Sequence, residues 1–119
     1  MGIIRYEDLD VYRKAVDLTL AVYAWTRHFP SDERFALSCQ MHRASASVPA
    51  NIAEGFVRRR PKDKARFYNI AEGSAEELSV FVRLAEKLGY PQQPPGLLGM
   101  VKDAAKMLRR LTDVTLARA

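Results

Sequence analysis

Six basic residues lie within nine positions near the middle of this 119-residue chain. The run from 58 to 66 contains a single acid, Asp63, and the bases Arg58, Arg59, Arg60, Lys62, Lys64 and Arg66. Such a cluster binds phosphate groups without reading base sequence, so the run is a candidate RNA- or DNA-binding site. The alternative is a solvated junction between helices, because the dipole of a helix favours cations near its C-terminus.

Four more bases near the C-terminus have the spacing of one helix face, and they extend the candidate surface: Lys102, Lys106, Arg109 and Arg110. The chain carries a net charge of +5, yet residues 67–99 are net negative, so the excess base is local. Neither a helix-turn-helix nor an RNA-recognition signature occurs. Nucleic-acid binding is therefore predicted from charge alone.

A second pattern is a line of polar residues at helical spacing: Gln40, Arg43, Ser47, Asn51 and Glu54. At 100° per residue they fall within roughly 80° of one another. They form either an ordinary solvated face or a hydrogen-bonded network that fixes the register between helices or subunits. In the second case Arg43 and Glu54 need partners, because an unpaired buried charge is costly.

Catalytic and metal chemistry have little support. Cys39 and His42 lie on adjacent turns and His28 is a third potential ligand, but there is no fourth for a zinc site. Glu72 and Glu76 share a helix face, which is typical of solvation. Glycine-rich phosphate loops and nucleophile elbows are absent. We expect no catalytic residue, no cofactor and no metal.

The single cysteine and the absence of a long apolar segment indicate where the protein is found. Cys39 has no disulfide partner in the chain, and we expect a buried thiol in a reducing cytosol. The longest uncharged stretch, residues 88–101, contains three prolines, and the opening residues lack the apolar core of a signal peptide. A cytoplasmic protein without a membrane span is predicted.

Four amphipathic segments must position these groups. Their apolar stripes are Val11, Ala15, Leu18, Val22, Trp25 and Phe29; Leu37, Met41, Ala44, Val48 and Ile52; Phe67, Ala71, Ser74, Leu78, Phe81, Ala85 and Leu88; and Leu97, Val101, Ala104, Leu108, Leu111 and Thr115. Spacings of three and four residues are typical of helices with one buried face. Short connections make neighbouring helices antiparallel. Residues 1–119 are therefore predicted to form one all-α domain, an antiparallel up-down-up-down four-helix bundle.

Local signals mark the helix ends. Ser31 and Asp32 are predicted to cap the second helix, Pro61 to begin the third, and Gly89 to follow its end. Pro49 falls inside the second stripe, so this helix is predicted to be kinked near Pro49 and then to resume.

Two stripes are wider than one core requires. The extra residues are Tyr12, Val16, Thr19 and Tyr23 beside the first stripe and Ile70 and Leu84 beside the third. Additional apolar breadth indicates a second contact surface. The alternative is a core stripe of generous width.

Three blocks of the sequence form a further pattern. The central block contains Gln40, Arg43-Ala44, Ser47-Val48-Pro49, Asn51 and Ile52-Ala53-Glu54-Gly55. A second block contains Phe67, Ala71, Gly73-Ser74, Glu77 and Leu78, and the third is the opening YEDLDVYRKAVDL. Together these blocks resemble a known family, the 23S rRNA intervening-sequence proteins. The resemblance covers about residues 5–90, and the last helix matches only in its pattern.

The resemblance implies an up-down bundle that assembles as a homo-oligomer of five subunits, with no catalytic residues to carry over. Some relatives are encoded inside rRNA intervening sequences. Others resemble accessory proteins of diversity-generating retroelements, which bind a reverse transcriptase and nucleic acid. We therefore expect a non-enzymatic, ring-forming adaptor with a basic surface that associates with RNA, DNA or a nucleic-acid enzyme. The alternative is a structural scaffold that binds only protein.

Overall fold

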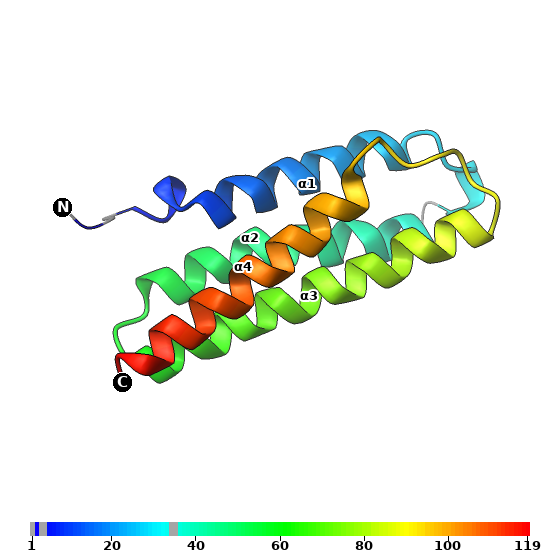
Figure 1. The fold of residues 1–119 in the computed structure, drawn as a ribbon. Helices are drawn as coiled ribbons and strands as arrows, with labels where there is room; N and C mark the ends of the chain where they lie inside the picture. The colour runs from blue at the N-terminus through cyan, green and yellow to red at the C-terminus, as the bar shows by residue number, and fades with distance from the viewer. Residues whose placement is uncertain (1, 3–4, 34–35) are drawn as a thin grey trace.

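The computed structural model describes residues 2, 5–33 and 36–119, which fold into an elongated bundle of 46 × 22 × 19 Å. Its helices are α1 (Asp10–Thr26), α2 (Leu37–Val57), α3 (Pro61–Lys87) and α4 (Leu97–Ala117), with short 3-10 turns η1 (Tyr6–Asp8) and η2 (Ser31–Glu33). Successive helices run antiparallel (Figure 1). Both α2 and α4 pack against α1 and α3, which lie diagonally opposite each other. The predicted all-α four-helix bundle is confirmed. Within the described residues, no helix has the length and apolar character needed to cross a bilayer.

Three of the four predicted stripes form the core. Every member of the first stripe is buried, as are four of the five in the second. In the fourth stripe only Leu111 is half-buried. Leu18, Met41, Ile52 and Leu108 are fully buried and fill the centre of the bundle.

The third stripe is partly wrong, because α3 is rotated relative to the prediction. Leu88 is exposed and Phe67 is only half-buried, whereas Tyr68 and Val82 lie in the core. The helix carries apolar side chains on both candidate faces, so periodicity alone does not choose between them. Packing against α2 decides which face of α3 is buried. The Tyr68 ring lies on Gly55, where an added Cβ would be 2.8 Å from Tyr68 Cε1.

The predicted helix ends hold at α3 but not at α2. Pro61 begins α3, and Gly89, with φ of 78°, follows its C-cap. Ser31 and Asp32 do not cap α2, which begins only at Leu37, where its apolar spacing starts. They form the η2 turn instead, since short polar side chains favour local turns over helix interiors.

Helix α2 continues through Pro49 to Val57, and the predicted bend within it stays a prediction. Proline has no N–H, so it leaves the Ser45 carbonyl without its helical donor. The hydroxyl of Thr19 on α1 lies 2.9 Å from Ser45 O and 2.8 Å from Ala15 O, so one proton is shared between two carbonyls. A neighbouring helix thus stabilises the backbone that the proline disrupts.

The long connection between α3 and α4 crosses the end of α1 (Figure 1). Trp25 Nε1 donates to Pro91 O at 2.8 Å, and the Gln93 side chain accepts from Leu98 N at 3.1 Å in the first turn of α4. The Phe29 ring packs between those of Trp25 and Tyr90, with centroid distances of 4.9 and 5.0 Å. These contacts fix the loop to the end of the bundle.

Candidate nucleic-acid interface

The basic run lies at the opposite end, where α2 ends and α3 begins. Only three arginines, Arg58, Arg59 and Arg60, connect the two helices, and Pro61 then starts α3. The C-terminus of α4 reaches the same end of the bundle (Figure 1). We call this region, residues 58–66, the basic junction.

Half of the bases in the basic junction are engaged within the chain. Arg58 pairs with Glu54 at 2.7 Å, and its guanidinium lies over the Phe67 ring at 4.7 Å. Arg66 lies over the same ring at 4.6 Å. The Lys64 ammonium donates to Phe56 O at 2.6 Å, close to the C-terminus of α2, and partial burial lowers the pKa of Lys64. Cations at this position complement the negative end of the helix.

The other half faces solvent. Arg59, Arg60 and Lys62 are exposed, and none forms an ion pair with any described residue. Such cations keep all their hydrogen-bond donors available for phosphate oxygens. The structure therefore divides the six predicted residues into three that hold the junction together and three that are free to bind.

The bases of α4 do not extend the basic junction as one face. Lys102, Lys106 and Arg109 line a groove between α3 and α4 together with Glu72 and Glu76. Arg110 lines a different groove, beside the start of α1. Sequence spacing places these four bases on one helix, and only the packing shows which acids share a groove with them, although none of the four forms an ion pair with a described residue.

The polar line on α2 is a network at two of its five positions. Ser47 Oγ lies 2.8 Å from Ser74 Oγ on α3, and Asn51 Nδ2 donates to Ser47 O at 2.8 Å and to Ser47 Oγ at 2.9 Å. The other three (Gln40, Arg43 and Glu54) are exposed, and Glu54 pairs with Arg58, which directly follows α2. Within one subunit Arg43 and Glu54 are therefore not buried charges. A role for them between subunits stays a hypothesis.

Two hydroxyl groups that connect helices, those of Ser74 and Thr19, were not predicted from the sequence. Ser74 was assigned to the apolar stripe of its helix, and Thr19 to extra apolar breadth. Neither has a local signal that could have revealed its role, since each hydroxyl finds its partner on another helix.

Cys39 and His42, weighed for metal or thiol chemistry, lie on adjacent turns of α2. The thiol of Cys39 is exposed, so the expectation that it is buried is wrong. It lies nine residues before Val48, which at 100° per residue places it on the opposite, outer face of α2. No group of three or more His, Cys, Asp or Glu residues among those described is arranged to hold a metal.

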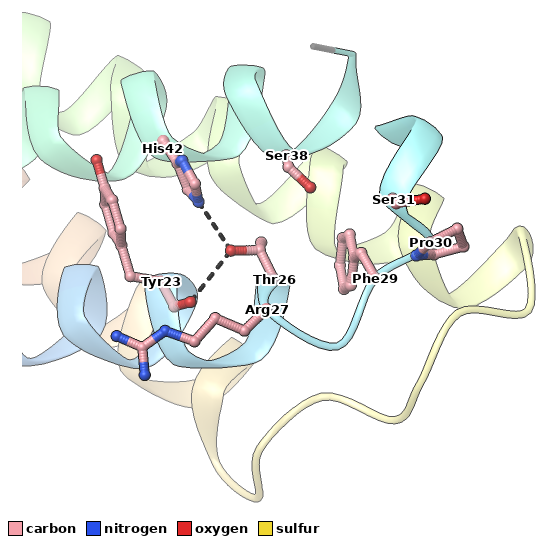
Figure 2. Close-up of a pocket in the computed structure, with 8 residues that line it drawn as sticks. All are labelled: Tyr23, Thr26, Arg27, Phe29, Pro30, Ser31, Ser38 and His42. Atoms are coloured by element: carbon pink, nitrogen blue, oxygen red, sulfur yellow. Dashed lines mark hydrogen bonds between the residues drawn. The ribbon is translucent and has the colours of Figure 1, made fainter. Parts of the chain in front are cut away.

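His42 is held between α1 and α2 beside a pocket at the loop end of the bundle (Figure 2). Its ring stacks on Tyr23, with centroids 4.0 Å apart, and its Nε2 lies 2.8 Å from Thr26 Oγ1. Thr26 Oγ1 is also 3.2 Å from Tyr23 O. Both bonds form together when Nε2 carries the proton, so we assign it there. Burial lowers the pKa of His42. This chain of bonds gives the histidine a structural role.

Comparison with known proteins agrees with the all-α fold. The 23S rRNA-intervening sequence protein family matches residues 7–110. The chain belongs to this family. A crystal structure from Bacteroides thetaiotaomicron, described as a protein with unknown function from the S23 ribosomal protein family, superposes on the bundle with a TM-score of 0.77. The two are 22% identical over 87% of this chain and 95% of that one, a likeness that shows the fold alone. None of the curated proteins matches the chain.

Proposed function

We propose that this member of the 23S rRNA-intervening sequence protein family is a non-enzymatic, homo-oligomeric adaptor that binds RNA or DNA through phosphate contacts in the cytoplasm. The observation that carries the proposal is the exposure of Arg59, Arg60 and Lys62 without an acid partner among the described residues. Phosphate contacts of this kind are tolerant of sequence and supply most of the affinity of non-specific binding.

Assembly is supported by apolar side chains that the bundle leaves on its surface. Ile70, Val80 and Leu84 on α3, and Leu88 directly after it, are each more than 40% exposed and lie on one side of the helix. Gly73 lies on the same side, and a Cβ added there would meet no atom within 4 Å. Leu20 and Tyr23 on α1 are exposed as well. Exposed apolar side chains gathered on one side of a helix favour a contact site, and the family resemblance favours a pentamer.

A ring would multiply the basic junction. Each subunit contributes the same three free bases, so a closed oligomer repeats them around its axis. After the first phosphate contact, later contacts are effectively intramolecular and raise the overall affinity. Weak contacts at single subunits are then sufficient for binding.

The second candidate function is a scaffold that binds only protein, such as a reverse transcriptase. The apolar surface of α3 favours it, because such a surface can also receive another chain. The two functions differ in salt dependence, since apolar contacts do not release counterions from nucleic acid.

Two measurements on the unmodified protein test the proposal. Light scattering should give a mass about five times the 13.5 kDa of one chain. In titrations with single-stranded RNA and duplex DNA of unrelated sequences, log affinity should fall linearly with log salt, by about 0.7 to 0.9 units per phosphate contact. A 13.5 kDa species at micromolar concentration would overturn the assembly. Absence of binding at low salt would overturn nucleic-acid binding and leave the protein-binding scaffold as the function.

A further inference from the structure

A cavity of about 520 Å³ lies beside the basic junction, between the α2–α3 connection and the C-terminal part of α4. Its apolar wall comes from Leu9, Phe56, Pro61 and Leu111. The volume is within the range of sites that bind small molecules, about 300 to 1,000 Å³. The rest of the wall includes two hydroxyl residues, Tyr68 and Thr115, and two basic residues, Lys64 and Arg118.

Two hydroxyl groups line this cavity without a hydrogen-bond partner among the described residues. Tyr68 is 3% exposed and Thr115 is 9% exposed, so both side chains are at least nine-tenths buried. Thr112, one turn earlier on α4, donates to Leu108 O at 2.8 Å, whereas Thr115 makes no such bond. Among the described residues, every side-chain oxygen or nitrogen that is fully shielded from solvent has a hydrogen-bond partner. The unpartnered hydroxyls of Tyr68 and Thr115 are therefore not fully shielded, and they reach solvent through the cavity. Burial also raises the pKa of Tyr68, so the phenol stays protonated and can donate.

Two cations line the same cavity. Lys64 is engaged at the junction by one donor to Phe56 O and by the Phe56 ring, but its other two donors have no partner among the described residues. Arg118 is exposed, and neither cation forms an ion pair with a described residue. The cavity therefore combines an apolar wall, two unpaired hydroxyls and two positive charges without an acid partner.

We propose that this cavity binds one unstacked nucleotide. The Phe56 ring already has the Lys64 ammonium 5.4 Å from its centroid and the Tyr6 ring packed edge-on at 6.5 Å, so the base lies along the apolar wall beside Phe56 and hydrogen-bonds to the hydroxyls of Tyr68 and Thr115. The phosphate pairs with Lys64 and Arg118. Aromatic side chains and arginines bind the bases and phosphates of single strands in the same way.

The polar groups select this chemistry over other anions. A fatty acid would leave both hydroxyls unpaired, at a cost that a ligand with polar ring atoms avoids. An inorganic anion would leave the apolar wall unfilled. The inference deepens the proposed function: Arg59, Arg60 and Lys62 hold neighbouring phosphates while the cavity holds one nucleotide. The source is either a free mononucleotide or one residue of a single-stranded chain.

The test uses the full chain with four probes: uridine 5′-monophosphate, adenosine 5′-monophosphate, uridine and inorganic phosphate. Calorimetry or NMR titration should show saturable binding of a monophosphate and much weaker binding of uridine or phosphate. The variants Tyr68→Phe and Thr115→Val keep shape and remove one hydroxyl each. Each should weaken monophosphate binding about threefold to tenfold, the range expected for one hydrogen bond. Thr112→Val is the matched control, since its hydroxyl is already paired on α4, and it should leave binding unchanged.

The outcomes separate the cavity from the proposed function. If phosphate alone binds as well as a monophosphate, or if Tyr68→Phe and Thr115→Val change nothing while thermal unfolding shows folded protein, the nucleotide site is overturned. Oligonucleotide binding that persists in both variants without any monophosphate binding leaves the basic junction intact and removes the cavity. Monophosphate binding without oligonucleotide binding keeps the cavity as a free-nucleotide site and removes the adaptor function.

Discussion

The basic junction and the bases of α4 are alike in sequence and differ in their surroundings. At the junction, Arg59, Arg60 and Lys62 extend from a tight connection, with no acid paired to them among the described residues. On α4, Lys102, Lys106 and Arg109 also form no ion pair with a described residue, but they share their groove with Glu72 and Glu76 of α3 as well as Arg83. The local potential is set by every charge within about 10 Å, so a count along one helix overestimates what α4 offers to phosphate.

The two sets of bases also differ in their distance from the end of the bundle that holds the basic junction. Lys102 lies 15 residues before the end of α4 and Arg109 lies eight before it. At 1.5 Å per residue these are about 22 Å and 12 Å from the end of the bundle that holds the basic junction. A nucleic-acid strand bound at the junction would therefore reach Arg109 before Lys102.

The largest effect is expected from the junction itself. The variant Arg59→Ala, Arg60→Ala, Lys62→Ala removes three unpaired charges and should reduce the slope of log affinity against log salt by about two units for single-stranded RNA. The fold should persist, because all three side chains are exposed. A slope equal to that of the unmodified protein would show that the junction is only a solvated connection between helices.

A smaller effect is expected from α4. Replacing Lys102, Lys106 and Arg109 by Ala removes the same number of charges, yet the slope should change by less than about one unit, because Glu72 and Glu76 in the same groove already offset part of their positive charge in the unmodified protein. This variant is the charge-matched control for the first. If it flattens the slope as much as the junction variant, the two regions bind together and the distinction between them fails.

The smallest effect is expected from Arg58→Ala. Its guanidinium is engaged with Glu54 and Phe67, so the salt slope should stay within error, while Arg59→Ala should lower it by about 0.7 units for single-stranded RNA. The free energy of unfolding should fall by up to about 1 kcal/mol, the sum of one exposed ion pair and one exposed cation–π contact. Chemical denaturation measures the second change. A loss of slope as large as that of Arg59→Ala would show that Arg58 binds phosphate despite its partners.

The sequence alone determined the fold and most of the core. Residues at spacings of three and four specify which face of α1, α2 and α4 is buried, because burial acts on each helix separately. Pro61 and Gly89 mark the ends of α3 through backbone conformation, which is also local. The basic run is visible for the same reason, since its six bases are neighbours in the chain.

Tertiary structure decided what depends on partners from other helices. Both faces of α3 are apolar, and only packing on Gly55 brings Tyr68 into the core instead of Phe67. The Arg58–Glu54 pair is local, four residues apart, but the rest of the division into engaged and free bases depends on where the ring of Phe67 and the carbonyl of Phe56 come to lie.

The bond from Thr19 to Ser45 O and the cavity lined by Tyr68 and Thr115 share this character. Each joins groups that are far apart along the chain. Helical periodicity reports whether a face is buried. It carries no information about which hydroxyl or carbonyl the opposite helix presents, so these sites emerge only when the helices pack.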